Sequence, residues 1–161
     1  MRSGNRGARR DDARRGDARR GGADAASALD GVPRALPALM RAHKLSKRAA
    51  RVGFDFEHAS QTADKVAEEL AEVREAAAAH EAPSAGPSRE IFEEIGDLLF
   101  AAANLARKLD VDAEAALRAA NAKFERRFRA MEERASARGE DFASLSLAAQ
   151  EALWLDVKRA E

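Results

Sequence analysis

The sequence feature that most restricts the fold is a regular apolar pattern between residues 91 and 109. Apolar residues recur there at intervals of four, three, four, three and four positions, at Ile91, Ile95, Leu98, Ala102, Leu105 and Leu109. An α-helix completes a turn every 3.6 residues, so this spacing places all of them on one face. The pattern therefore predicts an amphipathic helix that packs this face against neighbouring helices.

Similar apolar periods elsewhere predict an all-α protein. Four other helices are expected. The first begins between Pro33 and Pro37 and ends near Val52, and the second follows residues 60–62. The remaining two cover residues 113–137 and the stretch from Ser144 or Ser146 to about Arg159. In the second of these four helices, the expected core stripe is Ala63, Val66, Leu70, Val73 and Ala77, and the acidic residues of this helix are expected to flank the core rather than occupy it. Short loops between amphipathic helices are typical of antiparallel neighbours, so we expect an antiparallel bundle of four to five helices.

Local residues support several of these boundaries. Ser88 and Asp112 stand just before predicted helices, where their side-chain oxygens can accept hydrogen bonds from free backbone N–H groups. Gly53 follows the first predicted helix and is suited to the positive φ angle that ends many helices. The cap residues therefore agree with the apolar pattern on where the helices begin and end.

The first 32 residues differ from the rest of the chain. They are rich in arginine, glycine, alanine and aspartate, and they lack aromatic side chains. Such a segment buries too little apolar surface to offset its chain entropy, so we expect a disordered tail at 1–32 and a folded domain at 33–161. An arginine-rich tail could contact RNA or an acidic partner, but a solvated extension or a start codon assigned too far upstream is the preferred explanation.

Composition excludes several classes of protein. The chain has 28 basic and 28 acidic residues, so no overall field favours nucleic acid or an acidic membrane surface. It contains no cysteine, which excludes disulfides and thiolate metal sites and fits a reducing compartment. Its longest apolar run, residues 98–103, is far shorter than the roughly 20 residues of a membrane span. We therefore expect a cytoplasmic protein with neither a membrane nor a nucleic-acid partner.

Acidic residues are concentrated on two neighbouring predicted helices: Glu68, Glu69 and Glu72 on one, and Glu93, Glu94 and Asp97 on the next. Residues three apart on a helix point to nearly the same side, so each helix presents a pair of carboxylates. Two facing pairs would repel each other unless a cation lies between them. Oxygen-only ligands favour magnesium, manganese or calcium over zinc, so the spacing predicts a metal site. A single acidic face would be ordinary solvated surface.

A basic cluster lies on the helix predicted at 113–137 and consists of Lys123, Arg126 and Arg127. Ammonium and guanidinium groups share the charge of phosphate oxygens, so this cluster could hold a metal-bound polyphosphate. Without the acidic pairs, this basic cluster would be interpreted as ordinary solvent-exposed surface. The only tryptophan, Trp154, is expected to be a packing residue on these grounds alone.

At these residues the chain resembles the MazG-type nucleoside triphosphate pyrophosphohydrolases, and most of all the C-terminal catalytic domain of the two-domain bacterial proteins. The motif EExxE, followed by ExxD, GDLLFA and NxKFERRF, carries the resemblance, which extends over residues 36–161. It implies an all-α homodimer that hydrolyses nucleoside triphosphates to the monophosphate and pyrophosphate. The chain departs from the family by having the arginine-rich tail in place of an N-terminal repeat, and by a slightly longer loop at residues 81–88.

Carried over residue by residue, the resemblance implies magnesium, with manganese as a substitute, bound by Glu69, Glu72, Glu94 and Asp97. It implies nucleotide binding by Lys65, Glu68, Glu69, Glu90, Glu93, Asp97, Lys123, Arg126, Arg127 and Trp154. The roles of Lys65 and Trp154 depend on the resemblance alone. Water would attack the α-phosphorus and expel pyrophosphate, with Glu68 or Glu69 as the catalytic base. The alternative is a non-catalytic helical module for nucleotide sensing or protein interaction, whose acidic faces are only solvated.

Overall fold

The computed structural model describes residues 26–80 and 88–161, and within these ranges the chain forms helices and turns without strands. The helices are α1 (Ala38–Ala50), α2 (Ala59–Ala79), α3 (Arg89–Lys108), α4 (Ala113–Ala137), the short 3-10 helix η2 (Phe142–Ser144) and α5 (Leu147–Arg159). The predicted all-α class is therefore confirmed. Most of the predicted tail and of the long loop at 81–88 lies outside the described residues. No helix in the described ranges combines the length and apolarity that a membrane crossing needs.

Side-chain caps define where three of these helices begin. Ser88, Asp112 and Ser146 each accept a hydrogen bond from the backbone N–H three residues further on, at 3.2, 3.0 and 3.3 Å respectively. The first two caps are those expected from the sequence, and Ser146 rather than Ser144 begins the last helix. Such a cap stabilises a helix by about 1 kcal/mol, because it satisfies an N–H group that has no partner within the helix.

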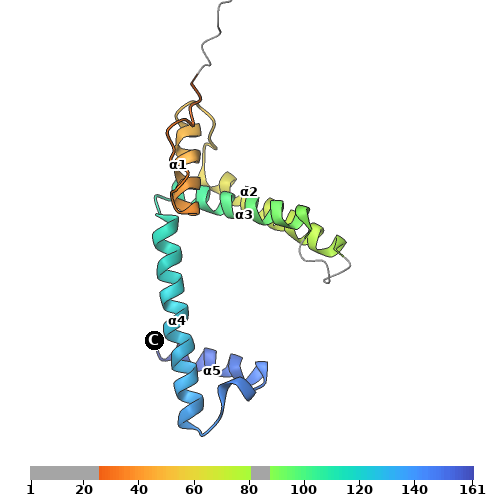
Figure 1. The fold of residues 1–161 in the computed structure, drawn as a ribbon, viewed down its shortest axis with the longest axis vertical. Helices are drawn as coiled ribbons and strands as arrows, with labels where there is room; N and C mark the ends of the chain where they lie inside the picture. Colours follow the sequence, from red (N-terminus) through yellow and green to blue (C-terminus); the bar gives the residue numbers. More distant parts are fainter. Residues whose placement is uncertain (1–25, 81–87) are drawn as a thin grey trace, which may run out of the picture.

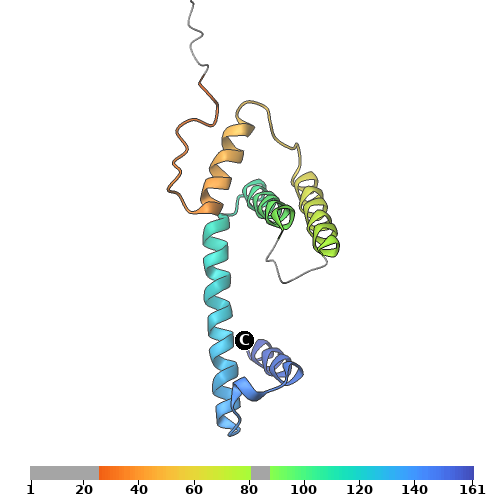
Figure 2. The ribbon, with the colours of Figure 1, turned by 45° about the vertical axis from the view of Figure 1, so that its right-hand side comes forward.

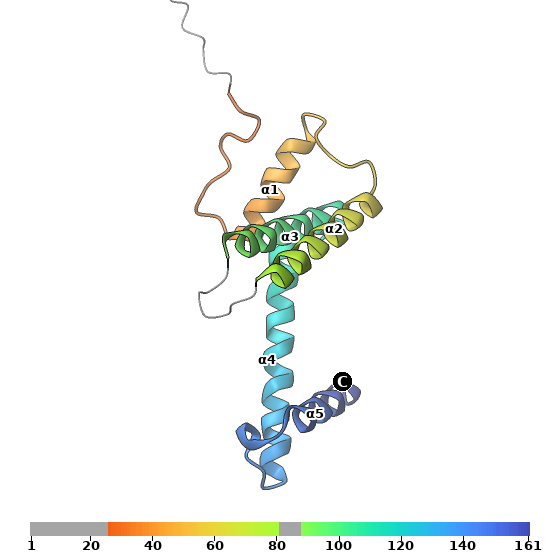
Figure 3. The same cartoon turned by 90° about the vertical axis from the view of Figure 1, so that its right-hand side faces the viewer.

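The helices form two packed groups that α4 joins (Figures 1 and 2). In the first group α2 and α3 lie side by side as an antiparallel hairpin, and α1 packs against α3. The long helix α4 starts beside α1 and runs away from the hairpin, and α5 folds back against its far end (Figure 3). The hairpin and the second half of α4 are thus well separated within one chain.

A cluster of buried apolar side chains lies between α4 and α5. Met131 and Ala135 of α4 are buried against Leu153 and Val157 of α5. Phe142 of η2 closes one side of this cluster, with its ring edge-on to Phe128 at 5.2 Å between centroids. Fully burying a large apolar side chain contributes about 1.5–3 kcal/mol, so this cluster fixes α5 on α4.

The buried face of α2 differs from the expected one. Thr62, Glu69 and Ala76 are buried against the rest of the chain, whereas Leu70 of the predicted stripe is 40% exposed. Residues seven apart lie nearly in line on a helix, so the buried row and the apolar stripe are neighbouring columns. The prediction that the carboxylates only flank the core was therefore wrong for Glu69, because the polar column of α2 faces α3.

An ionic cluster fastens the connector between α1 and α2 to the end of α3. Arg107 Nη2 donates to Asp55 Oδ1 at 2.6 Å, and Lys108 Nζ donates to Asp55 Oδ2 at 3.3 Å. Burial by itself would raise the pKa of Asp55, but the hydrogen bonds and charges of Arg107 and Lys108 outweigh it and hold this pKa below its ordinary value. The folded state therefore stabilises the charged carboxylate.

Replacing Asp55 by asparagine is expected to lower the free energy of unfolding by about 1–2 kcal/mol at pH 7, because two charge-assisted hydrogen bonds are weakened. A carboxyl whose pKa is lowered by folding contributes its stability above its unfolded pKa, and this contribution is lost as the pH falls through the folded pKa. The difference between the two proteins should therefore shrink below about pH 4. Urea unfolding at several pH values measures this difference in the free energy of unfolding. Asp64→Asn is the control, because Asp64 is exposed.

Candidate active site

Three of the four predicted metal ligands come together between α2 and α3. Glu69, Glu94 and Asp97 each offer a carboxylate oxygen, and these oxygens lie within 4.8 Å of one another. The antiparallel hairpin brings them together, because Glu69 lies in the middle of α2 and the other two lie one turn apart on α3. Glu69 is 6% exposed, while the other two are progressively more open to solvent. The cluster thus has a buried floor and an open mouth.

Glu72, the fourth predicted ligand, lies next to this cluster. Burial raises the pKa of Glu72, and so do the neighbouring carboxylates of Glu69 and, more weakly, Glu94, whereas the charge of Lys65 lowers it. A raised pKa is the expected result when like charges are held together in a partly dry place. The carboxylates on the two helices therefore influence one another, while the predicted role of Glu72 as a metal ligand stays a prediction.

Lys65 supplies the cluster with a positive charge. Its Nζ lies 2.7 Å from Glu69 Oε1 and 2.8 Å from Glu68 Oε1. The hydrogen bonds that Lys65 donates to Glu68 and Glu69 raise the pKa of Lys65 above its ordinary value. No spacing rule singles out this lysine in the sequence, whereas the structure places it directly beside the acidic cluster.

The geometry of the cluster fits a hard divalent cation. All three donors are carboxylate oxygens, the type that magnesium and manganese prefer over softer ligands. Two oxygens on opposite sides of magnesium, each about 2.1 Å from the ion, would lie about 4.2 Å apart. Because the three oxygens lie within 4.8 Å of one another, only a small adjustment of side chains is needed to reach that value.

The remaining acidic residues of the predicted site lie at its edge. The side chain of Glu68 is 59% exposed, and it pairs with Lys65 rather than joining the three clustered carboxylates. Glu90 and Glu93 lie in the first turns of α3 and are exposed, and Arg89 Nε donates to Glu93 Oε1 at 2.7 Å. These positions leave Glu68, Glu90 and Glu93 accessible to a ligand that enters from solvent.

Within one chain, the basic cluster does not join the acidic one. Lys123, Arg126 and Arg127 lie in the part of α4 that runs away from the α2–α3 hairpin (Figure 1). Arg127 Nη2 instead donates to Glu161 Oε2 at 2.5 Å. The hydrogen bond from Arg127 lowers the pKa of Glu161, and the charges of all three basic residues lower it further. Burial acts in the opposite direction but is outweighed.

Trp154 lies beside the same basic cluster. The guanidinium carbon of Arg127 is 5.4 Å from the centroid of the Trp154 ring, a cation–π distance. Phe124 packs against this ring at 5.8 Å between centroids. The structure therefore brings Trp154 and Arg127 together as one surface, while their predicted contact with a nucleotide stays a prediction.

One group of polar residues near the end of α3 was missed in the sequence. Asp55, Arg107 and Lys108 form the ionic cluster described above, and Arg107 Nε also donates to Asn104 Oδ1 at 2.9 Å. More than 50 residues separate Asp55 from its partners, and no spacing rule connects positions so far apart. Only the packing of α1 against α3 brings them together.

Comparison with known proteins relates the chain to pyrophosphohydrolases. Residues 36–124 match the family model described as phosphoribosyl-ATP pyrophosphohydrolase. This range contains the whole acidic cluster and Lys65, and it ends before Arg126, Arg127 and Trp154.

Individual relatives extend the similarity. The chain is 50% identical over 136 residues to the nucleoside triphosphate pyrophosphohydrolase of Escherichia coli. The aligned region covers 84% of this chain and 50% of that protein. It is 44% identical over 98 residues to the Thermotoga maritima nucleoside triphosphate pyrophosphohydrolase/pyrophosphatase MazG, covering 61% of this chain and 35% of that protein. The chain thus spans at most about half the length of these relatives. It belongs to the phosphoribosyl-ATP pyrophosphohydrolase family, and within it the chain is similar to the MazG-type enzymes.

Proposed function

We propose that this chain hydrolyses nucleoside triphosphates to nucleoside monophosphate and pyrophosphate with the help of magnesium. The observation that carries the proposal is the convergence of Glu69, Glu94 and Asp97, in a chain 50% identical to a protein named for this activity. Clustered carboxylates are costly unless they have a partner, and a cation that also binds phosphate supplies one.

The four carboxylates Glu69, Glu72, Glu94 and Asp97 would hold the metal. A divalent cation supplies charge neutralisation for the triphosphate and makes a nearby water more acidic. Lys65, next to Glu69, is placed to contact a phosphate oxygen once the cation takes over its role in balancing the carboxylates. The open mouth of the cluster gives a triphosphate access from solvent.

Glu68 is the better of the two candidate bases. Glu69 is buried among the clustered carboxylates and would be less basic when bound to the metal. Glu68, the residue before it on α2, has a side chain that is more than half exposed. In the proposed step Glu68 takes a proton from water while the water oxygen bonds to the α-phosphorus. The bond between the α-phosphorus and its bridging oxygen breaks, and pyrophosphate leaves.

We also propose that the chain works as a homodimer. On the hairpin, Leu70 of α2 and Phe92, Ile95 and Leu99 of α3 are 40–75% exposed. Exposed large apolar side chains on both helices of one hairpin are what an interaction surface would offer. A second copy would cover this face and could bring its own Lys123 and Arg127 to the acidic cluster. Within one chain these residues lie far from that cluster, because α4 runs away from the hairpin.

The variant Leu99→Asp is expected to convert the dimer to a monomer, because a buried carboxylate without a partner is costly at an interface. Light scattering should then give 17.4 kDa in place of twice that mass. Leu147→Asp is the matched control, since Leu147 is 70% exposed on α5 and away from the hairpin. A wild-type protein with the mass of one chain would contradict the proposed dimer.

The hydrolase proposal is tested by measuring pyrophosphate release from a panel of nucleoside triphosphates, with magnesium, with manganese and with a chelator. Metal-dependent release of pyrophosphate and monophosphate is the expected result. Binding of triphosphates without any turnover would instead support the alternative, a non-catalytic nucleotide-sensing module. The same panel would identify the preferred base.

A further inference from the structure

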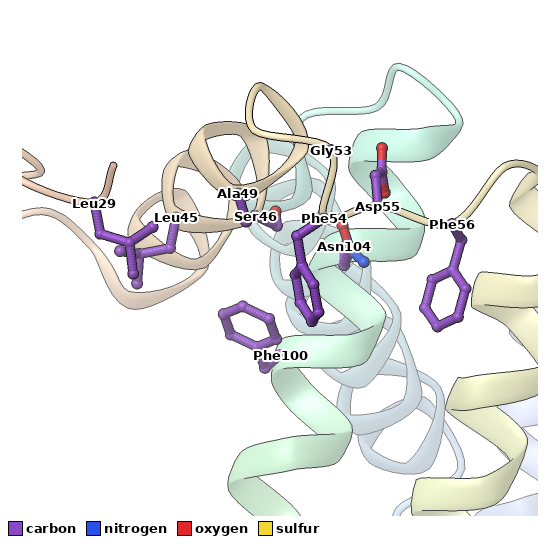
Figure 4. Close-up of a pocket in the computed structure, with 10 residues that line it drawn as sticks. All are labelled: Leu29, Leu45, Ser46, Ala49, Gly53, Phe54, Asp55, Phe56, Phe100 and Asn104. Atoms are coloured by element: carbon purple, nitrogen blue, oxygen red, sulfur yellow. The ribbon is translucent and has the colours of Figure 1, made fainter. Parts of the chain in front are cut away.

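An open pocket of about 570 Å³ lies between α1, α3 and the connector that joins α1 to α2 (Figure 4). Its walls are mainly apolar, with Leu45 of α1 and the aromatic rings of Phe54, Phe56 and Phe100. The volume falls within the range of about 300–1,000 Å³ typical of small-molecule sites. Flat aromatic walls suit a flat ligand, since offset or edge-to-face contacts between rings are favourable.

Asn104 gives this pocket an oriented hydrogen-bond donor. Arg107 Nε donates to Asn104 Oδ1 at 2.9 Å. A guanidinium group can only donate, so the amide oxygen must face Arg107 and the amide NH₂ faces away from it. In the described part of the chain this NH₂ group donates to no acceptor, although Asn104 lines the pocket. A ligand with an acceptor atom on its edge would satisfy it.

The same arginine holds the wall of the pocket in place. Arg107 Nη2 donates to Asp55, and Asp55 lies between Phe54 and Phe56 in the connector. Lys108 Nζ donates both to Asp55 and to the backbone carbonyl of Phe56. One ionic cluster therefore fixes the aromatic wall and the orientation of Asn104, as expected for a preorganised binding site.

The pocket lies at a useful distance from the acidic cluster. Asn104 follows Asp97 by seven residues on α3, which is about 20° around the helix and about 10 Å along it. Phe100 lies between them, one turn beyond Asp97. A nucleotide whose phosphates lie at Asp97 could therefore extend its base along α3 into the pocket.

The chemistry of the lining excludes phosphate as the occupant. Asp55 contributes a carboxylate whose lowered pKa keeps it charged, and the other lining groups are apolar or neutral. Asp55 is already paired with Arg107 and Lys108, so a phosphate group would find few free donors and no cationic side chain among the lining residues. A neutral heteroaromatic ring would gain apolar contacts with the aromatic walls, and an acceptor atom on its edge would pair with the Asn104 NH₂ group.

From this arrangement we propose that the pocket between α1 and α3 binds the nucleobase of the substrate. The Asn104 NH₂ group donates to a carbonyl oxygen or ring nitrogen on the base, and Phe54, which is 82% exposed, closes over the ring. This inference depends on the proposed function, because it assumes that the triphosphate lies at the acidic cluster.

The variant Asn104→Asp tests the hydrogen bond. The carboxylate still accepts from Arg107 but has no proton to donate to the base, and it places an acceptor opposite an acceptor. We expect KM for nucleoside triphosphates to rise about tenfold or more, as when a hydrogen bond to substrate is lost. Inhibition by inorganic tripolyphosphate, which has no base, should change by less than about twofold.

Phe54→Ala tests the aromatic wall with little risk to folding, since the ring is largely exposed. It should also raise KM for nucleoside triphosphates and leave inhibition by tripolyphosphate unchanged. Val52→Ala is the control, because Val52 is 67% exposed in the same connector and does not line the pocket. Melting temperatures of all three variants should remain close to that of the wild type.

The results separate the two proposals. A KM that is unchanged in Asn104→Asp and Phe54→Ala, or that changes in parallel with tripolyphosphate inhibition, overturns the base pocket and leaves the hydrolase intact. If the wild type releases no pyrophosphate, the hydrolase proposal fails, and the pocket is tested by calorimetric binding of the same triphosphates with magnesium. Weaker binding in Asn104→Asp would then support the pocket, and equal or absent binding would overturn it.

Discussion

Replacing Glu69 by glutamine is expected to lower pyrophosphate release by more than about a hundredfold, while the helices remain folded. Glu69 is the most buried of the clustered carboxylates and the one that α2 contributes to the cluster. Loss of even an outer partner of a metal ligand typically costs about 10–100-fold in metal affinity or activity, so loss of a ligand should cost more. Steady-state assays of pyrophosphate release measure this effect.

The same substitution separates a catalytic role from a structural one. Glutamine keeps the shape of the side chain, can still accept a hydrogen bond from Lys65, and removes one of several like charges. Lys65 also keeps its pairing with Glu68, so the melting temperature of metal-free protein should not fall. Magnesium at a hundred times its Kd should increase the free energy of unfolding of the wild type by about 2.7 kcal/mol, and it should therefore raise the melting temperature. It should have little effect on Glu69→Gln.

Glu75→Gln is the matched control for this experiment. Glu75 lies on the same helix, is exposed and stands apart from the clustered carboxylates. It should keep both activity and stabilisation by magnesium. Full activity in Glu69→Gln, or equal stabilisation of both variants by magnesium, would remove the basis for placing the metal at this cluster.

The limits of the helices could be predicted because they depend on local chemistry. The predicted range 113–137 is the observed range of α4, since the Asp112 cap and the apolar period both act within one or two turns. The acidic pairs were also predicted from local spacing. A hairpin with a short connection brings Glu69 near Glu94 and Asp97 once both segments are helical.

The buried face of α2 could not be predicted in the same way. An apolar stripe shows that a helix packs against something, and it does not show whether the partner is in the same chain. Here the column with Thr62 and Glu69 faces α3, and Leu70 is left 40% exposed. Leu70 and Ile95, which the apolar pattern assigned to the core of one chain, thus lie on the side of the hairpin that a second copy would cover.

The direction of α4 was equally hidden in the sequence. Short loops suggested that the basic cluster would lie in the same bundle as the acidic one, but the turn at Asp110, with φ of +58°, leads α4 away from the hairpin. Lys123 and Arg127 therefore cannot act on the acidic cluster of their own chain in this arrangement. If they bind the triphosphate, they must do so in a partner.

This arrangement predicts that two inactive variants restore each other's activity. Glu69→Gln lacks a metal ligand, and the double variant Lys123→Ala, Arg127→Ala lacks the predicted phosphate contacts. Each homodimer should be inactive or nearly so. In a dimer of one chain of each kind, two-fold symmetry pairs the intact acidic cluster of one chain with the intact basic cluster of the other.

Such a mixed dimer should show about half of the wild-type activity, because one of its two equivalent sites is complete and the other carries both defects. Co-expression with two different tags and sequential purification gives the mixed dimer, and pyrophosphate release measures its activity. If acidic and basic clusters of the same chain formed each site, both sites of the mixed dimer would carry one defect. The mixed dimer would then be as inactive as either parent, and the proposed contribution of Lys123 and Arg127 across the dimer would be wrong.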